Sequence, residues 1–166
     1  MERRTYNKKT TPVGDVYIVV EGQRLSAIYM GEEDFLEGEK EFMLTFDPSN
    51  SLIKRCMLQL DEYFNGDRKE FDIPIEPKGT NFQKAVWKEL SLIPFGETRS
   101  YQDIAVKIGK EKAVRAIGQA NKANRLPIII PCHRVIGKNK SLTGYAGTRT
   151  EIKEKLLTLE GAEYKK

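Results

Sequence analysis

Cysteine and histidine are scarce in this chain of 166 residues, which has two cysteines, Cys56 and Cys132, and one histidine, His133. Two thiols and one imidazole cannot supply the four ligands of a typical structural zinc site. A disulfide between the cysteines is not expected, because the sequence carries no secretion signal and cytosolic thiols stay reduced. We therefore predict two reduced thiols and no bound metal.

Long apolar runs are also lacking. No window approaches the roughly 18 consecutive apolar residues of a membrane-spanning helix, and no apolar run of a signal peptide follows the charged residues 1–9. Hydrophobic residues make up 39% of the chain and charged residues 31%, which is ordinary for a globular protein and argues against disorder. We expect a cytoplasmic location and no membrane partner.

Charge is divided unevenly along the chain. Residues 1–76 hold 10 basic and 16 acidic residues, a net charge of −6, whereas residues 77–166 hold 18 basic and 8 acidic residues, a net charge of +10. A basic half of this kind predicts contact with a polyanion such as nucleic acid. The alternative is that its lysine-rich helices are simply solvated.

The acidic half, residues 1–76, is predicted to be a small α+β support domain. Residues 13–20 and 25–30 are rich in β-branched residues around a polar turn, which indicates a hairpin, and a short strand is expected at 41–46. Apolar residues at three- and four-residue spacing predict a helix from Asn50 or Ser51 to Asn65, with Cys56 buried and inert. Residues 31–40 are expected to form a loop or a frayed helix start, and residues 71–75 an edge strand.

The basic half, residues 77–166, is predicted to be mostly helical. One helix follows the linker at 76–80, and Ser100 with Asp103 has the capping-box spacing that starts a second helix, which ends at Gly109. Residues 112–121 form a third helix with small residues and with charge from Arg115 and Lys122 nearby. Two short helices joined by a tight turn are typical of a helix-turn-helix. A last helix is expected to open at Thr148 and to end at Glu160-Gly161.

Cys132 and His133 stand side by side in the apolar stretch 128–137 and are the candidates for covalent chemistry. Neighbouring side chains on a strand point to opposite faces, but Pro131 argues against a regular strand, so a turn could bring thiol and imidazole together. An imidazole close to a thiol raises the thiolate fraction and makes the cysteine a nucleophile. The alternative is a buried cysteine beside a surface histidine, and spacing alone does not identify a third group.

The segment 131–136, Pro-Cys-His-Arg-Val-Ile, resembles the acceptor-site motif of the methylated-DNA–protein-cysteine methyltransferases, also called O6-alkylguanine-DNA alkyltransferases. Further matches follow in the same order over roughly residues 80–161, at 95–97, 100–101, 114–118, 124, 143–147, 156–157 and 160–161. The N-terminal half fits the family's ribonuclease-H-like first domain in element order only. The resemblance implies an α+β protein, with a small ribonuclease-H-like α/β domain before a mostly helical winged-helix (helix-turn-helix) domain.

The resemblance also implies a reaction. The Cys132 thiolate would attack the alkyl group on guanine O6 and keep it as a thioether, so that one molecule repairs one lesion and needs no cofactor. His133 would be the base, acting through a water, and Glu160 would orient it. The Tyr101 hydroxyl would help to protonate guanine as it leaves and would crowd the 3′ phosphate. Arg115 would fill the space that the flipped nucleotide vacates in the duplex.

The remaining site residues follow from the same resemblance. The family docks its second helix in the minor groove of double-stranded DNA, and we expect the protein to act as a monomer. Asn124 would tie the turn before the active-site segment to the second helix. The guanine pocket would be formed by the carbonyls of Cys132 and Val135, the amide of Ala146, and the side of the loop at Tyr145 and Gly147.

Three positions depart from the family pattern: Asn121 stands where some relatives carry a larger apolar residue, and Arg125 and Thr148 stand where the family often has a proline and a glycine. They put the preferred alkyl size in doubt more than activity, and O4-methylthymine stays open as a second substrate. Two other functions remain conceivable from the residues alone. One is a DNA-binding regulator or lesion sensor that performs no transfer, and the other is a cysteine hydrolase built on Cys132 and His133.

Overall fold

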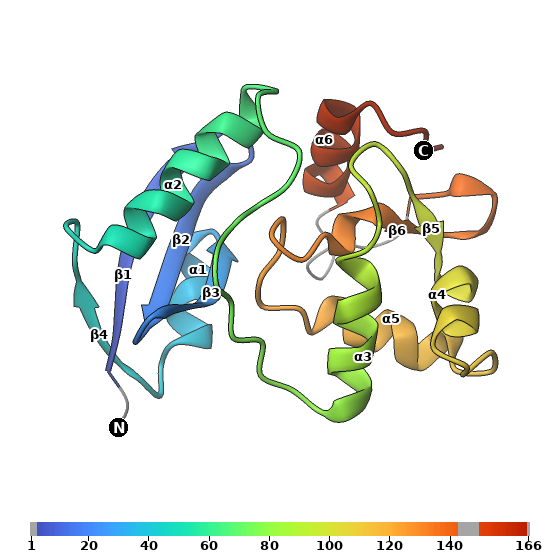
Figure 1. The fold of residues 1–166 in the computed structure, drawn as a ribbon, viewed down its shortest axis with the longest axis horizontal. Helices are drawn as coiled ribbons and strands as arrows, with labels where there is room; N and C mark the ends of the chain where they lie inside the picture. Colours follow the sequence, from blue (N-terminus) through green and yellow to red (C-terminus); the bar gives the residue numbers. More distant parts are fainter. Residues whose placement is uncertain (1–2, 143–149, 166) are drawn as a thin grey trace. The chain divides into compact units, whose positions relative to one another are not determined.

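The protein is described from a computed structural model that covers residues 3–142 and 150–165. The chain forms two compact units, Met1–Pro77 and Lys78–Lys166 (Figure 1). Each unit has its own core and is described separately.

The N-terminal unit is built on a four-stranded sheet of order β3-β2-β1-β4 (Figure 1). Its strands are β1 (Arg3–Thr11), β2 (Gly14–Glu21), β3 (Arg24–Met30) and β4 (Met43–Phe46). β1 and β2, and β2 and β3, pair antiparallel, whereas β4 runs parallel to β1. The predicted hairpin and the strand at 41–46 are confirmed, while β1 was not predicted.

Two helices pack on the sheet, α1 (Glu32–Gly38) and α2 (Ser51–Phe64). The Asn50 side chain accepts a hydrogen bond from the Ile53 amide and so caps α2, as predicted. Residues 31–40 were expected to form a loop or a frayed helix start, and most of them form the helix α1. The strand expected at 71–75 is wrong, because this segment forms only an isolated bridge between Leu25 and Ile75.

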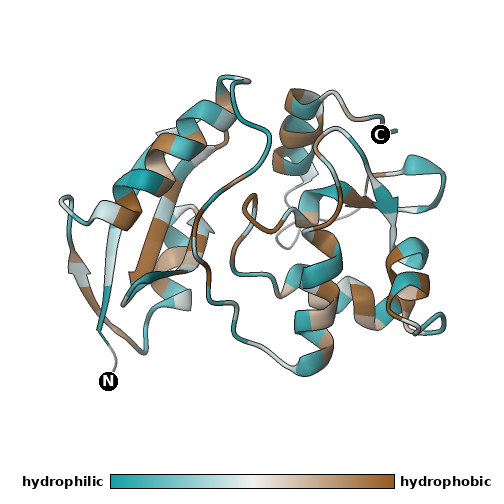
Figure 2. Ribbon diagram, in the orientation of Figure 1, coloured by the Kyte–Doolittle hydropathy of each residue, from teal (hydrophilic) through white to brown (hydrophobic). Residues whose placement is uncertain are grey.

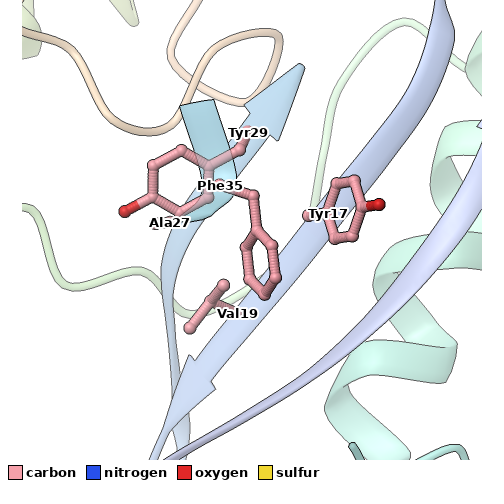
Figure 3. Packing of buried hydrophobic residues seen from close by; sticks show 5 residues of the cluster. All are labelled: Tyr17, Val19, Ala27, Tyr29 and Phe35. Carbon is pink, nitrogen blue, oxygen red and sulfur yellow. The ribbon is translucent and has the colours of Figure 1, made fainter. Parts of the chain in front are cut away.

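The core of this unit lies on both faces of the sheet, because successive strand residues point to opposite sides. On one face, Tyr17, Val19, Ala27 and Tyr29 surround Phe35 of α1 (Figure 3). The Phe35 ring stacks on Tyr17 with centroids 4.3 Å apart. The colouring of β2 as hydrophobic along much of its length agrees with burial on both sides (Figure 2).

The C-terminal unit is mostly helical (Figure 1). Its helices are α3 (Asn81–Leu90), α4 (Tyr101–Lys107), α5 (Val114–Lys122) and α6 (Thr150–Glu160). Two short strands, β5 (Arg99–Ser100) and β6 (Val135–Ile136), pair in parallel. Two 3-10 turns, η1 (Cys132–Arg134) and η2 (Lys138–Lys140), flank β6. The expected helix start at Thr148 lies outside the described residues.

Local sequence explains where these helices begin. Thr80 and Ser100 each accept a hydrogen bond from the amide three residues on, and Gln83 and Asp103 return the bond, so both helices start with a complete capping box. The helix-turn-helix is formed by α4 and α5, which pack together. α3 supports α5, because the Trp87 indole donates a buried hydrogen bond of 2.8 Å to the Ala120 carbonyl. This bond holds α5 against α3.

Candidate active site

The chain enters the site through a loop that one amide side chain holds in place. Asn124 accepts a hydrogen bond from the Leu126 amide at 2.9 Å and donates one to the Ile130 carbonyl at 2.9 Å. Between these contacts, Ile128 has a φ of 74°, a left-handed conformation that is unfavourable for a β-branched residue. Asn124, which follows the end of α5, thus bonds across a strained loop to the segment before Cys132.

Cys132, His133 and Arg134 lie on the 3-10 turn η1 and not on a strand. The Arg134 amide donates to the Pro131 carbonyl at 3.0 Å, and the Cys132 amide donates to the Ile130 carbonyl at 2.7 Å. With three residues per turn, successive side chains point about 120° apart instead of to opposite faces. All three side chains are buried: Cys132 is 4% exposed, His133 0% and Arg134 6%. The expectation that Pro131 prevents a regular strand is confirmed.

Glu160, at the end of α6, is the third group that spacing alone did not identify. Its carboxylate lies 2.7 Å from His133 Nε2, and it accepts hydrogen bonds from Arg134 Nε at 2.8 Å and Arg134 Nη2 at 3.1 Å. Arg134 also donates to the Ile93 carbonyl at 2.7 Å. The carboxylate and the imidazole are both completely inaccessible to solvent. The three side chains therefore form one closed network.

The charges of this network follow from its burial. Burial alone would raise the pKa of Glu160, but the hydrogen bonds and charges of His133 and Arg134 outweigh it and lower the pKa to about 2. Burial lowers the pKa of His133, against the opposing effect of Glu160. At neutral pH the site therefore holds an ionised Glu160 and a neutral imidazole. With its hydrogen on Nε2 facing Glu160, the imidazole has its proton-accepting lone pair on Nδ1.

Lys153 is a second charged group of the site and was missed by the sequence analysis. It is 0% exposed, and its ammonium donates to the Val135 carbonyl at 2.5 Å. Burial lowers the pKa of Lys153 to about 8, while the charge of Cys132 raises it. Lys153 lies seven residues before Glu160, two helical turns along α6, so helical periodicity could have placed both on one face.

The helix-turn-helix carries the remaining predicted residues of the described chain. Tyr101 begins α4, and its ring lies over Gly118 of α5, where an added Cβ would meet Tyr101 Cε1 at 3.9 Å. Arg115 and Lys122 are exposed on α5, together with Gln119. The structure thus places a basic, exposed helix face next to a small residue. Tyr145, Ala146 and Gly147 lie outside the described residues.

Asn121, on the last turn of α5, contacts the acceptor segment directly. Its Nδ2 donates to the Cys132 carbonyl at 3.4 Å, and the residue is 4% exposed. From the sequence, Asn121 stood out only as a departure from the family pattern. The signal available in the sequence was a polar residue at the C-terminal end of an otherwise small-faced helix.

In residues 3–142 and 150–165, no group of three or more histidine, cysteine, aspartate or glutamate side chains could hold a metal ion. Within the same ranges, no helix is long and apolar enough to cross a membrane.

A helix-turn-helix with a basic face, beside a buried cysteine with a histidine–glutamate pair, defines a nucleic-acid-binding protein that carries a nucleophile. Residues 81–162 match the model of the 6-O-methylguanine DNA methyltransferase DNA-binding domain, and residues 4–77 match its ribonuclease-like domain. The chain belongs to the 6-O-methylguanine DNA methyltransferase family. The resemblance drawn from the motifs is confirmed, as is the α+β fold with its ribonuclease-like and DNA-binding units.

Individual relatives agree over nearly the whole chain. The constitutive methylated-DNA–protein-cysteine methyltransferase of Bacillus subtilis is 48% identical over 96% of this chain and 97% of its own. The enzyme of that name from Methanosarcina barkeri is 44% identical over 93% of this chain and 96% of its own. A crystal structure of Mycobacterium tuberculosis OGT in complex with DNA has a TM-score of 0.84 and 40% identity, covering 96% of this chain and 92% of the other.

Proposed function

We propose that this protein is a methylated-DNA–protein-cysteine methyltransferase that repairs O6-alkylguanine in DNA by moving the alkyl group onto Cys132. The observation that carries the proposal is the buried network of His133 and Arg134 on η1 with Glu160 of α6, next to Cys132 and in the unit that also presents the basic helix α5. Relatives named for this activity are similar over almost the full chain.

The transfer is a single displacement. The Cys132 thiol gives its proton to His133 through a water, and the thiolate then attacks the alkyl carbon on guanine O6. The new S–C bond forms as the C–O6 bond breaks, the guanine takes a proton from the Tyr101 hydroxyl as it leaves, and the proton that His133 received then restores the Tyr101 hydroxyl. A thioether is not hydrolysed, so the protein is consumed after one lesion.

Glu160 and Lys153 would prepare the nucleophile in different ways. Ionised Glu160 accepts the Nε2 hydrogen of His133, which fixes the tautomer and stabilises the imidazolium once the proton arrives. Lys153 places a buried positive charge in the field of Cys132, where it favours the thiolate over the thiol. Arg134 keeps Glu160 ionised. Each charge in the site has a partner, so the burial of the network is not prohibitive.

Access to guanine requires that the nucleotide leave the duplex, because the thiolate cannot reach the alkyl carbon on O6 while the base is stacked. We propose that α5 enters the minor groove, with Arg115 filling the vacated space and Lys122 contacting phosphate. Gly118 and the small residues near it permit close approach. The pocket would include the Val135 carbonyl, and Tyr145, Ala146 and Gly147 are proposed for its wall. We propose that the acidic N-terminal unit supports this one and that the protein works as a monomer.

Mass spectrometry tests the proposal directly. The reduced protein is incubated with duplex DNA that contains O6-methylguanine, and its intact mass is followed. We expect one methyl-for-hydrogen exchange, mapped to the peptide that contains Cys132, with no turnover beyond one equivalent. Folded, reduced protein that gains no adduct would contradict the proposal, and repeated turnover would favour a hydrolase instead.

A further inference from the structure

Asn121 is a buried amide that the reaction described above does not use. Its Nδ2 donates to the Cys132 carbonyl at 3.4 Å. Its Oδ1 is buried and accepts no hydrogen bond from the residues that the structure describes. Most buried polar atoms in folded proteins have a partner, and one that lacks a donor is unfavourable. A bound group that brings a donor to this oxygen would therefore gain a strong interaction.

The position of Asn121 indicates which kind of molecule brings that donor. Arg115, Gly118 and Asn121 follow one another at three-residue steps on α5, so each is a neighbour of the next, and the line they form winds from the exposed side of the helix to its buried side. The line runs from the exposed Arg115, past the glycine that the Tyr101 ring covers, to the residue that touches Cys132. Asn121 thus contacts the backbone of the residue whose thiol an extruded base would have to reach.

We propose that Asn121 recognises the base, with its Oδ1 accepting a hydrogen bond from the 2-amino group of an O6-alkylguanine. This inference rests on the proposed function and names the base that the site prefers. Alkylation of O6 removes the hydrogen from guanine N1, which leaves the 2-amino group as the donor on the Watson–Crick edge. O4-alkylthymine has lost its N3 hydrogen and offers no donor on that edge. Asn121 therefore favours alkylated guanine over alkylated thymine.

The bond to the Cys132 carbonyl gives the amide its direction. Because Nδ2 is the end that can donate to a carbonyl, Oδ1 faces away from that oxygen and remains the acceptor. An apolar residue of the same size at this position could fill the volume but could not tell an amino group from a hydrogen atom. Asparagine at position 121 can therefore distinguish a base with a 2-amino group from one without it, whereas an apolar residue would provide only van der Waals contact.

The test compares two duplex oligonucleotides that differ only in the 2-amino group, one with O6-methylguanine and one with O6-methylhypoxanthine. Single-turnover rates of methyl transfer are measured for the wild type and for Asn121→Leu. We expect the wild type to react faster with O6-methylguanine. In the variant, the ratio of the two rates should fall about tenfold, the size of effect expected for one buried hydrogen bond. The preference for O6-methylguanine over O4-methylthymine should narrow in parallel.

Two controls separate recognition from stability. Both rates are measured on one preparation, so a loss of folded protein cancels in the ratio, and Asn121→Ala repeats the measurement with a smaller side chain. Gln59→Leu removes a buried amide of the N-terminal unit, which bonds the backbone of Asp72, and should leave the ratio unchanged. A wild-type ratio in both Asn121 variants would overturn the inference. A wild type that alkylates Cys132 with neither oligonucleotide would refute the proposed function itself.

Discussion

In the part of the chain that the structure describes, each unit buries an arginine–glutamate pair, Arg4–Glu39 and Arg134–Glu160, and the two pairs differ in the group that shares the carboxylate. In the N-terminal unit, Arg4 Nη1 donates to Glu39 at 3.0 Å, and the Tyr29 hydroxyl donates to the same carboxylate at 2.5 Å. In the C-terminal unit, the third partner of the Arg134–Glu160 pair is the imidazole of His133. A phenol stays protonated near neutral pH, whereas an imidazole can exchange its proton there. We therefore expect similar ion pairs to support structure in one unit and the proposed chemistry in the other.

The two cysteines show the same contrast. Cys56 of α2 is 0% exposed, and burial among apolar residues raises its pKa to about 12, so it remains a thiol. Cys132 is buried almost as deeply at 4% exposed, but charged side chains from η1 and α6 surround its turn. Burial alone therefore does not decide whether a thiol reacts. We expect the charged groups near the thiol to decide its reactivity.

Exchanging the two thiols one at a time gives the largest expected effect. Cys132→Ser should abolish methyl transfer, because a hydroxyl is far less acidic than a thiol. Cys56→Ser should keep the transfer rate per folded molecule while losing about 1–3 kcal/mol of stability, since it buries a hydroxyl. Adduct mass and chemical denaturation measure the two effects. Full activity of Cys132→Ser would show that the acceptor lies elsewhere.

The two glutamates give the next largest effect. Glu160→Gln should slow transfer by roughly 100-fold, because His133 loses the carboxylate that fixes its tautomer and stabilises its charge. Glu39→Gln should leave the transfer rate of folded protein unchanged. Both changes leave a buried arginine without its carboxylate, so both should lower stability, by about 3–5 kcal/mol. Equal transfer rates for the two variants in single-turnover assays would remove the distinction between the pairs.

Lys153→Met should have a smaller effect on rate. Loss of the buried cation raises the pKa of the Cys132 thiol, so the rate at neutral pH should drop, by roughly tenfold for each unit of pKa. The pH dependence of alkylation of Cys132 by iodoacetamide should move to higher pH by the same amount. Lys155→Met is the matched control, because Lys155 is exposed on the same helix. Superimposable pH profiles for the wild type and Lys153→Met would contradict the role of Lys153.

The pH dependence of stability should also differ between the wild type and Glu160→Gln. The folded pKa of Glu160 is about 2, below its ordinary value of 4.5. A carboxylate with a lowered pKa stabilises the fold above its unfolded pKa, and the contribution, about 3 kcal/mol, is lost as pH falls from about 4.5 toward 2. Denaturant titrations in that window should show a shallower loss in the variant. An unchanged slope would mean that Glu160 is not the group responsible.

The smallest expected effect is on DNA affinity. Arg115→Ala should weaken binding and lower the slope of log affinity against log salt by about 0.9 if Arg115 neutralises one phosphate, or by less if its role is to fill the duplex. Lys54→Ala, an exposed change on α2 of the acidic unit, should alter neither quantity. A fluorescence titration at several salt concentrations measures both variants. An equal effect of the two changes would mean that the charge difference between the units does not direct binding.

Local signals made much of the fold predictable. The hairpin of β2 and β3, the cap at Asn50 and the capping box at Ser100 depend on residues close together in the sequence. β1 was not predicted because it is strongly polar, and its pairing with β2 and β4 is what makes it a strand. The segment at 71–75 has the composition of a strand but only one bridging partner, at Leu25.

The site was predictable only in part, for a similar reason. Cys132 and His133 stand together in the sequence, so their chemistry could be suspected, but Glu160 is 27 positions from His133 and its approach depends on tertiary packing. The resemblance to a family supplied Glu160 where spacing did not. Lys153 was missed because a lysine on a helix is expected to face solvent. Only the structure shows it buried against the Val135 carbonyl.

The two hydrogen bonds of Asn124 also limit where residues can be inserted into the protein or deleted from it. One side chain spans the loop from Leu126 to Ile130 and holds Ile128 in its left-handed conformation. An insertion or deletion inside this loop would change the path between the two hydrogen bonds and would move Cys132 relative to α5. Reporter tags and insertions are therefore better placed at exposed turns of the other unit, such as Gly22 or Gly66, where added residues leave the acceptor in register.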